Sequence, residues 1–222
     1  ICWLLKKLTV TEFLGTENIP LTGGVLIATN HMSRMDIPVL FLTPNRPDMT
    51  ALVTTKYLKY PLIRWFIVTA RGIWLDRDTA DFGAFRTAVN ALNEGLAIGI
   101  APEGTRSVTA NLLEGKPGTA LLALKAGVPI LPVALTGTED SVQKMLRFKK
   151  PHITVEYGKL IPAPMPDRQN RADQLQKLTD ELMCQIAAML PEKYWGFYAG
   201  HPRLKEILAE KNETKSKIIP DC

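Results

Sequence analysis

Short apolar segments alternate with amphipathic segments through the middle of the chain. Each apolar segment is four to six residues long, and most are hydrophobic at successive rather than alternate positions. Segments of this length and pattern predict strands of a sheet that is covered on both faces. The predicted strands are residues 25–29, 51–54, 96–101, 130–135 and 153–157.

The amphipathic segments between these strands predict helices. Apolar side chains recur at helical spacing across residues 82–92, with Gly95 placed to end that helix, and residues 118–126 form another helix before Gly127. Alternating strands and helices are typical of the α/β class. We therefore expect a single domain with a mainly parallel, twisted sheet flanked by helices.

The pattern changes after the proline-rich segment 161–166. Apolar side chains from Leu175 to Ile186 line one face of a helix that Pro191 ends, and a short helix is expected near Pro202. Three regions follow from this: an α/β core with an interfacial N-terminal segment, a C-terminal helical extension packed on it, and a polar tail whose composition favours disorder. Their bounds are 1–166, 167–210 and 211–222.

Size and composition limit the class of protein. The chain has 222 residues, of which 46% are hydrophobic and 22% charged, as in one globular domain. Its apolar segments are too short to span a membrane, although the start at Ile1 leaves a preceding hydrophobic segment open. The three cysteines, Cys2, Cys184 and Cys222, lie far apart, which predicts a reducing compartment and no metal site.

The chain is basic, with a formal charge of +5 and a pI of about 9.1. This balance favours anionic partners, such as nucleic acid, phosphorylated metabolites or an acidic membrane surface. Charge alone does not choose among them.

The strongest local motif is NHMSRMD at residues 30–36, directly after a predicted strand. His31 is thereby placed at the carboxyl end of the strand, where open α/β sheets bind ligands. A helix is expected to begin near Asp36, and its carboxylate can return to one imidazole nitrogen and leave the other as a base. The alternative is that Asp36 only caps its helix and His31 is an ordinary loop residue.

A second polar motif, PEGTRS at residues 102–107, follows another predicted strand. Gly104 permits close approach of a ligand to the backbone, and arginine can grip a phosphate through two parallel hydrogen bonds. The glycine spacing of nucleotide-binding loops is missing, and the alternative is ordinary turn chemistry with solvated charges. Donors to an anion in this motif are Thr105, Arg106 and Ser107, Lys116 follows just past it, and Arg77 stands after another short apolar run.

Together these motifs resemble the glycerolipid acyltransferases, typified by 1-acylglycerol-3-phosphate acyltransferase. The resemblance runs from about Leu14 to Pro162 and leaves the C-terminal helices uncovered. It departs from the usual residues at Trp74 and Ala101, two positions expected to shape the acyl groove. Four ordered blocks carry it: Asn30, His31, Ser33 and Asp36; Gly72, Asp76 and Arg77; residues 103–107; and residues 128–133.

The resemblance implies acyl transfer from a thioester of coenzyme A or acyl carrier protein to the free hydroxyl of a lysophospholipid. The expected acceptor is 1-acylglycerol-3-phosphate, the product is phosphatidic acid, and no cofactor is expected beyond the thioester co-substrate. His31 is the predicted base, held by Asp36. The predicted phosphate-binding residues are Arg77, Arg106, Lys116 and Thr105. The residues predicted to bind or orient substrate are Asn30, Ser33, Glu103, Gly104 and Ser107. A carboxylate beside an anion is unfavourable, so we expect Glu103 to orient Arg106 or to bind a hydroxyl.

Aromatic or aliphatic side chains stand beside cations in residues 3–7 and 56–60, and residues 144–150 form a basic run. Such segments suit an anionic bilayer surface. They predict peripheral or monotopic attachment at the cytoplasmic face of a membrane. The alternative is that the N-terminal segment packs on the core and residues 144–150 form a solvated loop.

Two other classes of function compete with this interpretation. A thioesterase or lipid hydrolase would use Ser33 or Ser107 as nucleophile, yet the chain has no GxSxG motif. A non-catalytic module that binds membrane or nucleic acid would explain the basic charge, but not His31 and Asp36 at a strand end. We therefore expect no nucleic-acid partner.

Overall fold

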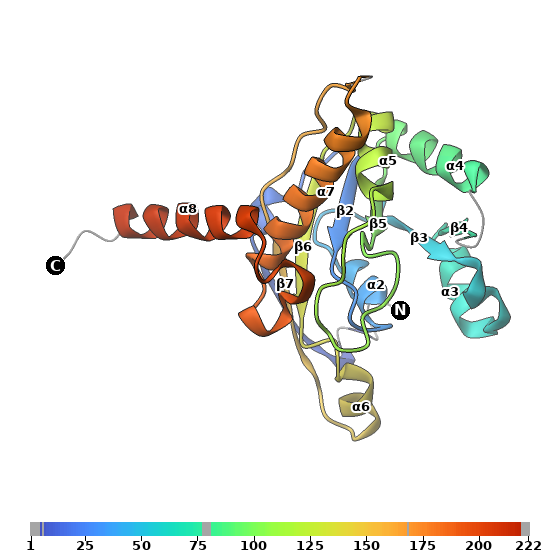
Figure 1. The fold of residues 1–222 in the computed structure, drawn as a ribbon. Helices are drawn as coiled ribbons and strands as arrows, with labels where there is room; N and C mark the ends of the chain where they lie inside the picture. Colours follow the sequence, from blue (N-terminus) through green and yellow to red (C-terminus); the bar gives the residue numbers. More distant parts are fainter. Residues whose placement is uncertain (1–4, 6, 77–80, 168, 219–222) are drawn as a thin grey trace.

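The computed structural model describes residues 5, 7–76, 81–167 and 169–218, the side chains of Leu62 and of residues 214–218 excepted. A seven-stranded sheet forms its centre, in the order β1-β7-β6-β2-β5-β3-β4 (Figure 1). Neighbouring strands are parallel except β6 and β7, which are antiparallel, so the predicted α/β class is confirmed. The strands are β1 (Val10–Leu14), β2 (Val25–Thr29), β3 (Thr50–Thr54), β4 (Ile73–Leu75), β5 (Ala97–Ile100), β6 (Ile130–Thr136) and β7 (His152–Tyr157).

Strand β2 lies in the middle of the sheet and is buried along its whole length. Leu26 is in register with Ile98 of β5 on one side and with Ile130 of β6 on the other. Leu26 faces one hydrophobic cluster and the next residue, Ile27, faces a second cluster. Both faces are therefore covered, which is why the sequence of this strand is apolar throughout.

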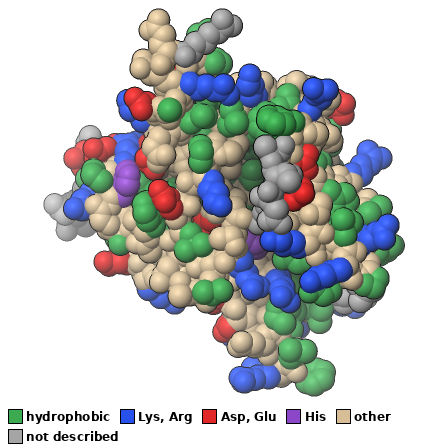
Figure 2. All heavy atoms as spheres, turned by 45° about the vertical axis from the view of Figure 1, so that its right-hand side comes forward, with side chains coloured by type: hydrophobic (Ala, Val, Ile, Leu, Met, Phe, Trp, Pro, Cys, Tyr) green, Lys and Arg blue, Asp and Glu red, His purple; other side chains and the backbone are tan. Residues whose placement is uncertain are grey.

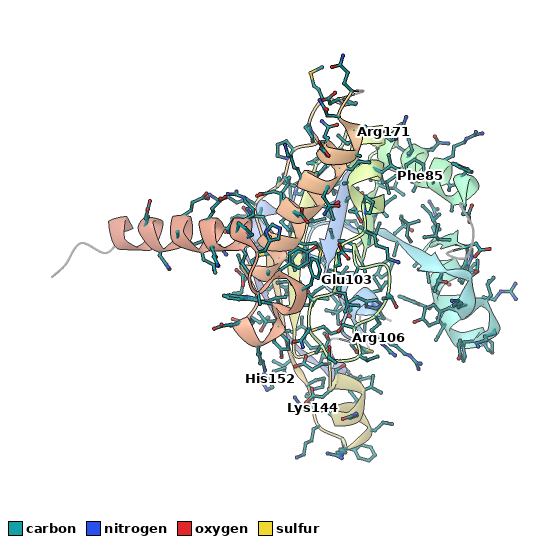
Figure 3. All side chains as sticks on the ribbon, in the orientation of Figure 1. Phe85, Glu103, Arg106, Lys144, His152 and Arg171 are labelled. Atoms are coloured by element: carbon teal, nitrogen blue, oxygen red, sulfur yellow. The ribbon has the colours of Figure 1, made fainter. Side chains whose placement is uncertain are left out.

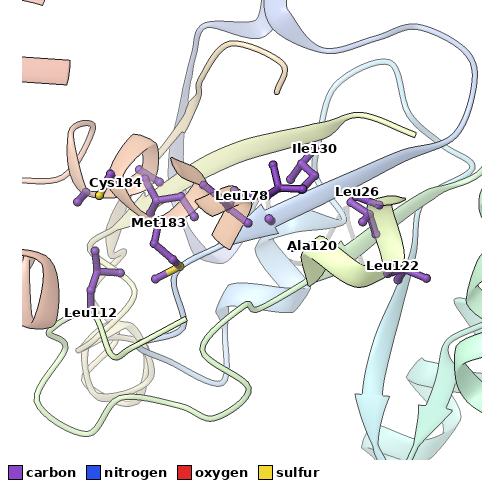
Figure 4. Close-up of a cluster of buried hydrophobic side chains, with 14 of the residues drawn as sticks. Leu26, Leu112, Ala120, Leu122, Ile130, Leu178, Met183 and Cys184 are labelled. Carbon is purple, nitrogen blue, oxygen red and sulfur yellow. The ribbon is translucent and has the colours of Figure 1, made fainter. Parts of the chain in front are cut away.

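Helices supply the outer layers. Helices α4, α5 and α7 contribute to the first cluster, part of which Figure 4 shows, and α2 contributes to the second. No helix in the described ranges has both the length and the apolar composition of a membrane span. The helices are α2 (Asp36–Leu40), α3 (Pro61–Thr69), α4 (Phe82–Asn93), α5 (Gly118–Ala126), α6 (Ser141–Leu146), α7 (Arg171–Ala187) and α8 (Pro202–Ile218), with short 3-10 turns η1 (Thr16–Asn18), η2 (Thr55–Lys59), η3 (Glu192–Tyr194) and η4 (Gly196–Tyr198).

The loops after β2, β5 and β6 leave the sheet at the same edge, because these three strands are adjacent and parallel. The first loop carries His31, the second carries residues 101–117, and the third leads to α6. Segments that are far apart in the sequence therefore meet at this edge, which we call the carboxyl edge.

The C-terminal region differs from the expectation. Helix α7 packs on β6 and α5, but the helix expected near Pro202 is longer than predicted and projects from the body (Figure 1). Residues 211–218, for which a polar, disordered tail was predicted, continue α8, and residues 219–222 lie outside the described ranges. Leu204 and Ile207 anchor the start of this helix in the core, and the Lys211 Nζ donates to the Ala188 carbonyl.

Candidate active site

The loop after β2 brings His31 and Asp36 together. Asp36 is the first residue of α2 and is fully buried, and its Oδ2 lies 2.9 Å from the His31 Nδ1. The same oxygen accepts hydrogen bonds from the backbone N–H groups of Met32 and Ser33, each at 2.7 Å. The contact predicted between the two side chains is confirmed. The catalytic role remains a prediction.

This contact fixes the tautomer of the imidazole. A carboxylate only accepts, so the His31 Nδ1 carries the proton and Nε2 keeps a free lone pair in the neutral ring. The His31 side chain is 14% exposed and lines an apolar groove. A histidine that lines a groove and has one nitrogen held by a carboxylate matches the arrangement of a general base.

The groove beside His31 has a volume of about 320 Å³ and runs between α2 and α3. Its side chains are mostly apolar, with Ile37, Phe66 and Ile67 among them, and Arg34 adds a cation. Neither Arg34 nor α3 was predicted to form part of the site. Ala101, one of the two departures from the family pattern, lines the groove, whereas Trp74 does not.

Asn30 occupies a different place from the one expected. Its side chain is fully buried, donates to the Leu135 carbonyl at 3.0 Å and accepts from the Leu135 N–H at 2.8 Å. It therefore joins the end of β2 to β6 and does not face the groove. A buried amide with both halves satisfied fixes the position of the next residue, His31.

The two serines predicted near the site are also buried. The Ser33 Oγ accepts from the Met35 N–H at 3.2 Å, and the Ser107 N–H donates to the His31 carbonyl at 2.8 Å. Both residues hold the loop that carries His31. Neither hydroxyl is placed as an exposed nucleophile, which argues against the hydrolase alternative.

Glu103 is 1% exposed and both of its carboxylate oxygens accept backbone hydrogen bonds. The His31 N–H donates to Oε1 at 2.7 Å, and the Leu113 N–H donates to Oε2 at 2.9 Å. Burial raises the pKa of this carboxyl to about 7, although the two backbone donors oppose the shift. Glu103 thus braces two loops against each other, and it neither orients Arg106 nor faces a hydroxyl site.

The predicted phosphate-binding residues are only partly brought together. Lys116 lines a cavity of about 280 Å³ that shares Ala101 and Leu52 with the groove. Arg106 and Thr105 are exposed on the loop that carries Glu103, and neither lines either cavity. Figure 3 labels Glu103 and Arg106. Among the described residues, no carboxylate pairs with the Lys116 or Arg106 side chain. Arg77 lies outside the described residues.

Gly104 allows Lys116 to reach this position. Its φ is +69°, and an added Cβ would lie 3.0 Å from the Lys116 Cδ. The Lys116 N–H also donates to the Pro102 carbonyl at 2.8 Å. The Lys116 side chain packs against the backbone at Gly104, and the approach of a ligand to Gly104 remains a prediction.

The fold and this site define the class of protein. A sequence model of the acyltransferase family matches residues 10–136, more than half of the chain, so the chain belongs to the acyltransferase family.

Within this family, the chain is similar to curated proteins of one named activity. The chain is 33% identical over 149 residues to a 1-acyl-sn-glycerol-3-phosphate acyltransferase of Borreliella burgdorferi, covering 66% of this chain and 58% of the relative. It is 34% identical over 162 residues to one of Cocos nucifera, covering 71% and 51%. The chain therefore spans a little over half the length of these relatives.

A solved structure has the same fold. The crystal structure of the 1-acyl-sn-glycerophosphate acyltransferase PlsC from Thermotoga maritima matches with a TM-score of 0.62 and 24% identity. The match covers 80% of this chain and 76% of the other. At this identity the similarity supports the fold.

Proposed function

We propose that the chain transfers an acyl group from a thioester of coenzyme A or acyl carrier protein to the hydroxyl of a lysophospholipid. The proposed acceptor is 1-acylglycerol-3-phosphate and the product is phosphatidic acid. One observation carries the proposal: a fixed His31–Asp36 pair opens onto an apolar groove in a chain of the acyltransferase family. The names of the curated relatives support the choice of acceptor.

The proposed reaction proceeds in one displacement. The His31 Nε2 removes the proton of the acceptor hydroxyl while its oxygen forms a bond to the thioester carbonyl carbon. The carbon–sulfur bond then breaks, and the imidazolium, stabilised by Asp36, returns the proton to the thiolate. The lipid supplies the nucleophile, so the chain needs no covalent acyl intermediate and no metal or cofactor of its own.

The surroundings of His31 fit both substrates. The apolar groove suits an acyl chain, since transfer of hydrocarbon from water into such a groove is favourable. Lys116, in the adjoining cavity, and Arg106 and Thr105, on the exposed loop, are proposed to hold the acceptor phosphate. Arg77 keeps the same proposed role on the basis of its motif alone.

A membrane surface is the proposed source of the acceptor. In Figure 2 hydrophobic and basic side chains gather at the lower end of the molecule, which is the α6 end in Figure 1. Leu146 is 77% exposed and Phe148 is fully exposed there, with Arg147, Lys149 and Lys150 beside them. This combination supports peripheral attachment to an anionic bilayer, proposed at the cytoplasmic face.

Replacing His31 with alanine tests the proposal. Loss of a general base costs on the order of 100- to 10,000-fold in rate, so kcat for phosphatidic acid formation should fall by at least that range. Asp36 keeps its two backbone hydrogen bonds in this variant, so the Tm should change little. Purified protein is assayed with labelled acyl-CoA and acyl carrier protein thioesters against a panel of lysophospholipids. A His31→Ala variant that retains most of its activity contradicts the mechanism.

Thioester hydrolysis without acceptor, abolished by Ser33→Ala, would instead establish the hydrolase alternative.

A further inference from the structure

An aromatic segment near the C-terminus, residues 194–198, packs on the loop that precedes α5. The Leu112 N–H donates to the Tyr194 carbonyl at 2.8 Å, and the Phe197 N–H donates to the Leu112 carbonyl at 3.0 Å. The Gly115 N–H donates to the Tyr198 hydroxyl at 2.9 Å. This segment lies beyond residues 10–136, which the family comparison covers, and the reaction as proposed gives it no role.

Gly115 is tightly packed, with no space for a side chain. Tyr198 is fully buried, and an added Cβ on Gly115 would lie 2.7 Å from the Met183 Cγ and 3.2 Å from the Tyr198 oxygen. Leu112 and Met183 belong to the same buried cluster (Figure 4). The loop is therefore held both by packing against α7 and by the tyrosine hydroxyl.

The same loop reaches the proposed site on its other side. The Leu113 N–H donates to Glu103, and the second oxygen of that carboxylate accepts from the His31 N–H. Lys116 directly follows Gly115, and its N–H donates to the Pro102 carbonyl. A displacement at Gly115 would thus be transmitted to the cation in the cavity beside His31.

We propose that Tyr198 is a positioning residue, whose hydroxyl holds Gly115 so that the Lys116 ammonium stays beside the cavity next to His31. This inference rests on the proposed function, in which Lys116 holds the acceptor phosphate. A helical extension outside the matched residues thereby sets the geometry of acceptor binding.

The test compares two buried tyrosines in the full chain. Tyr198→Phe removes the only side-chain acceptor that the described residues give to the Gly115 N–H. The acceptor KM should rise about fivefold to tenfold, with the thioester KM unchanged and kcat within about threefold. Tyr157→Phe is the matched control, because Tyr157 is 2% exposed and donates to the Thr43 Oγ1 at 3.0 Å in the other cluster. It should lower the Tm similarly without raising the acceptor KM.

A double-mutant cycle with Lys116→Met shows whether Tyr198→Phe acts by displacing Lys116 or by destabilising the fold in general. If Tyr198 acts through Lys116, adding Tyr198→Phe to Lys116→Met should raise the acceptor KM no further. An unchanged acceptor KM in Tyr198→Phe, or effects that multiply in the double variant, would overturn the inference.

Hydrogen exchange of residues 111–116, measured well below the Tm of each variant, gives a readout that does not depend on catalysis. Exchange should accelerate in Tyr198→Phe and not in Tyr157→Phe. If Lys116→Met alone leaves the acceptor KM unchanged, the proposed phosphate site fails, and accelerated exchange then still supports the hold on the loop. Unchanged exchange refutes that hold.

Discussion

The Oδ2 atom of Asp36 accepts from the His31 imidazole and, independently, from two backbone N–H groups of the same loop. The backbone bonds fix this carboxylate whether or not the imidazole is present. Asp36 is fully buried, and its other oxygen, Oδ1, has no partner among the described residues. The pair is therefore a rigid unit and not a transient contact.

The Asp36→Asn variant keeps the His31 side chain but changes the group that orients it, so it tests whether the orientation of His31 is needed for activity. One oxygen, Oδ2, makes all three contacts, so the amide has two choices. It can keep its oxygen at that position, which loses the negative charge beside the imidazole and buries an NH2 group where Oδ1 has no partner among the described residues, or it can turn its NH2 group toward the imidazole and the two loop N–H groups, from none of which it can accept. We expect kcat to fall on the order of 100- to 10,000-fold, together with a loss of stability of about 1–3 kcal/mol.

The matched control is Asp81→Asn, since Asp81 also begins a helix and accepts from the Ala84 N–H at 2.8 Å. It should lower stability without a comparable loss of kcat. Chemical denaturation and steady-state kinetics on both variants make the comparison. Equal kcat losses in the two variants would mean that only the helix cap matters.

The spacing within the NHMSRMD motif at residues 30–36 was sufficient to predict the His31–Asp36 contact, because a tight loop between a strand and a helix brings residues five apart together. The strands were predicted to within about a residue where they are buried on both faces. Two strands were not predicted: β1, whose exposure alternates along VTEFL, and β4, which has only three residues. Edge strands and very short strands carry too weak a hydrophobic pattern.

The partners of Asn30 and Glu103 could not be predicted in the same way. The family resemblance places both among the residues that bind or orient substrate. Their partners, Leu135 and Leu113, offer backbone groups, which leave no trace in the sequence. Only the assembled fold shows that these side chains face the protein and not the groove.

Glu103 predicts a specific pH dependence of stability. Its pKa is about 7 in the folded chain against an ordinary value of 4.5, so the folded state binds this proton more tightly. The stability from this group is fully present below about pH 4.5 and is lost as pH rises through about 7. A shift of this size corresponds to about 3 kcal/mol.

Urea unfolding of wild type and Glu103→Gln across pH 4.5 to 8 measures this contribution. The glutamine does not titrate, so the free energy of unfolding of wild type should decline relative to that of the variant over this range. Glu94→Gln, an exposed glutamate at the end of α4, serves as the control and should show no such trend. Parallel curves for wild type and Glu103→Gln would contradict the prediction.

Replacing a cation near the site should change the KM of the acceptor and leave the KM of the thioester nearly unchanged. Lys116→Met removes a charge-assisted hydrogen bond to the acceptor phosphate, so the acceptor KM should rise about tenfold with little change in the thioester KM. Arg106→Met should act in the same direction. Lys205→Met, which removes an exposed charge on α8, is the control. Equal changes in both KM values would assign these cations to the thioester instead.

The α6 end provides the last prediction, because its exposed side chains are costly in water. Phe148 is fully exposed at a φ of +56°, and Leu146 is 77% exposed. Burial of one such side chain in a bilayer interface is worth about 1.5–3 kcal/mol, so Phe148→Ser should weaken binding to anionic vesicles about tenfold or more. Leu21→Ser is the control, since Leu21 is 69% exposed but precedes β2 and lies away from the carboxyl edge. Vesicle flotation with and without anionic lipid makes the measurement. If both variants lose vesicle binding equally, or if binding does not depend on anionic lipid, the α6 end is not the membrane contact.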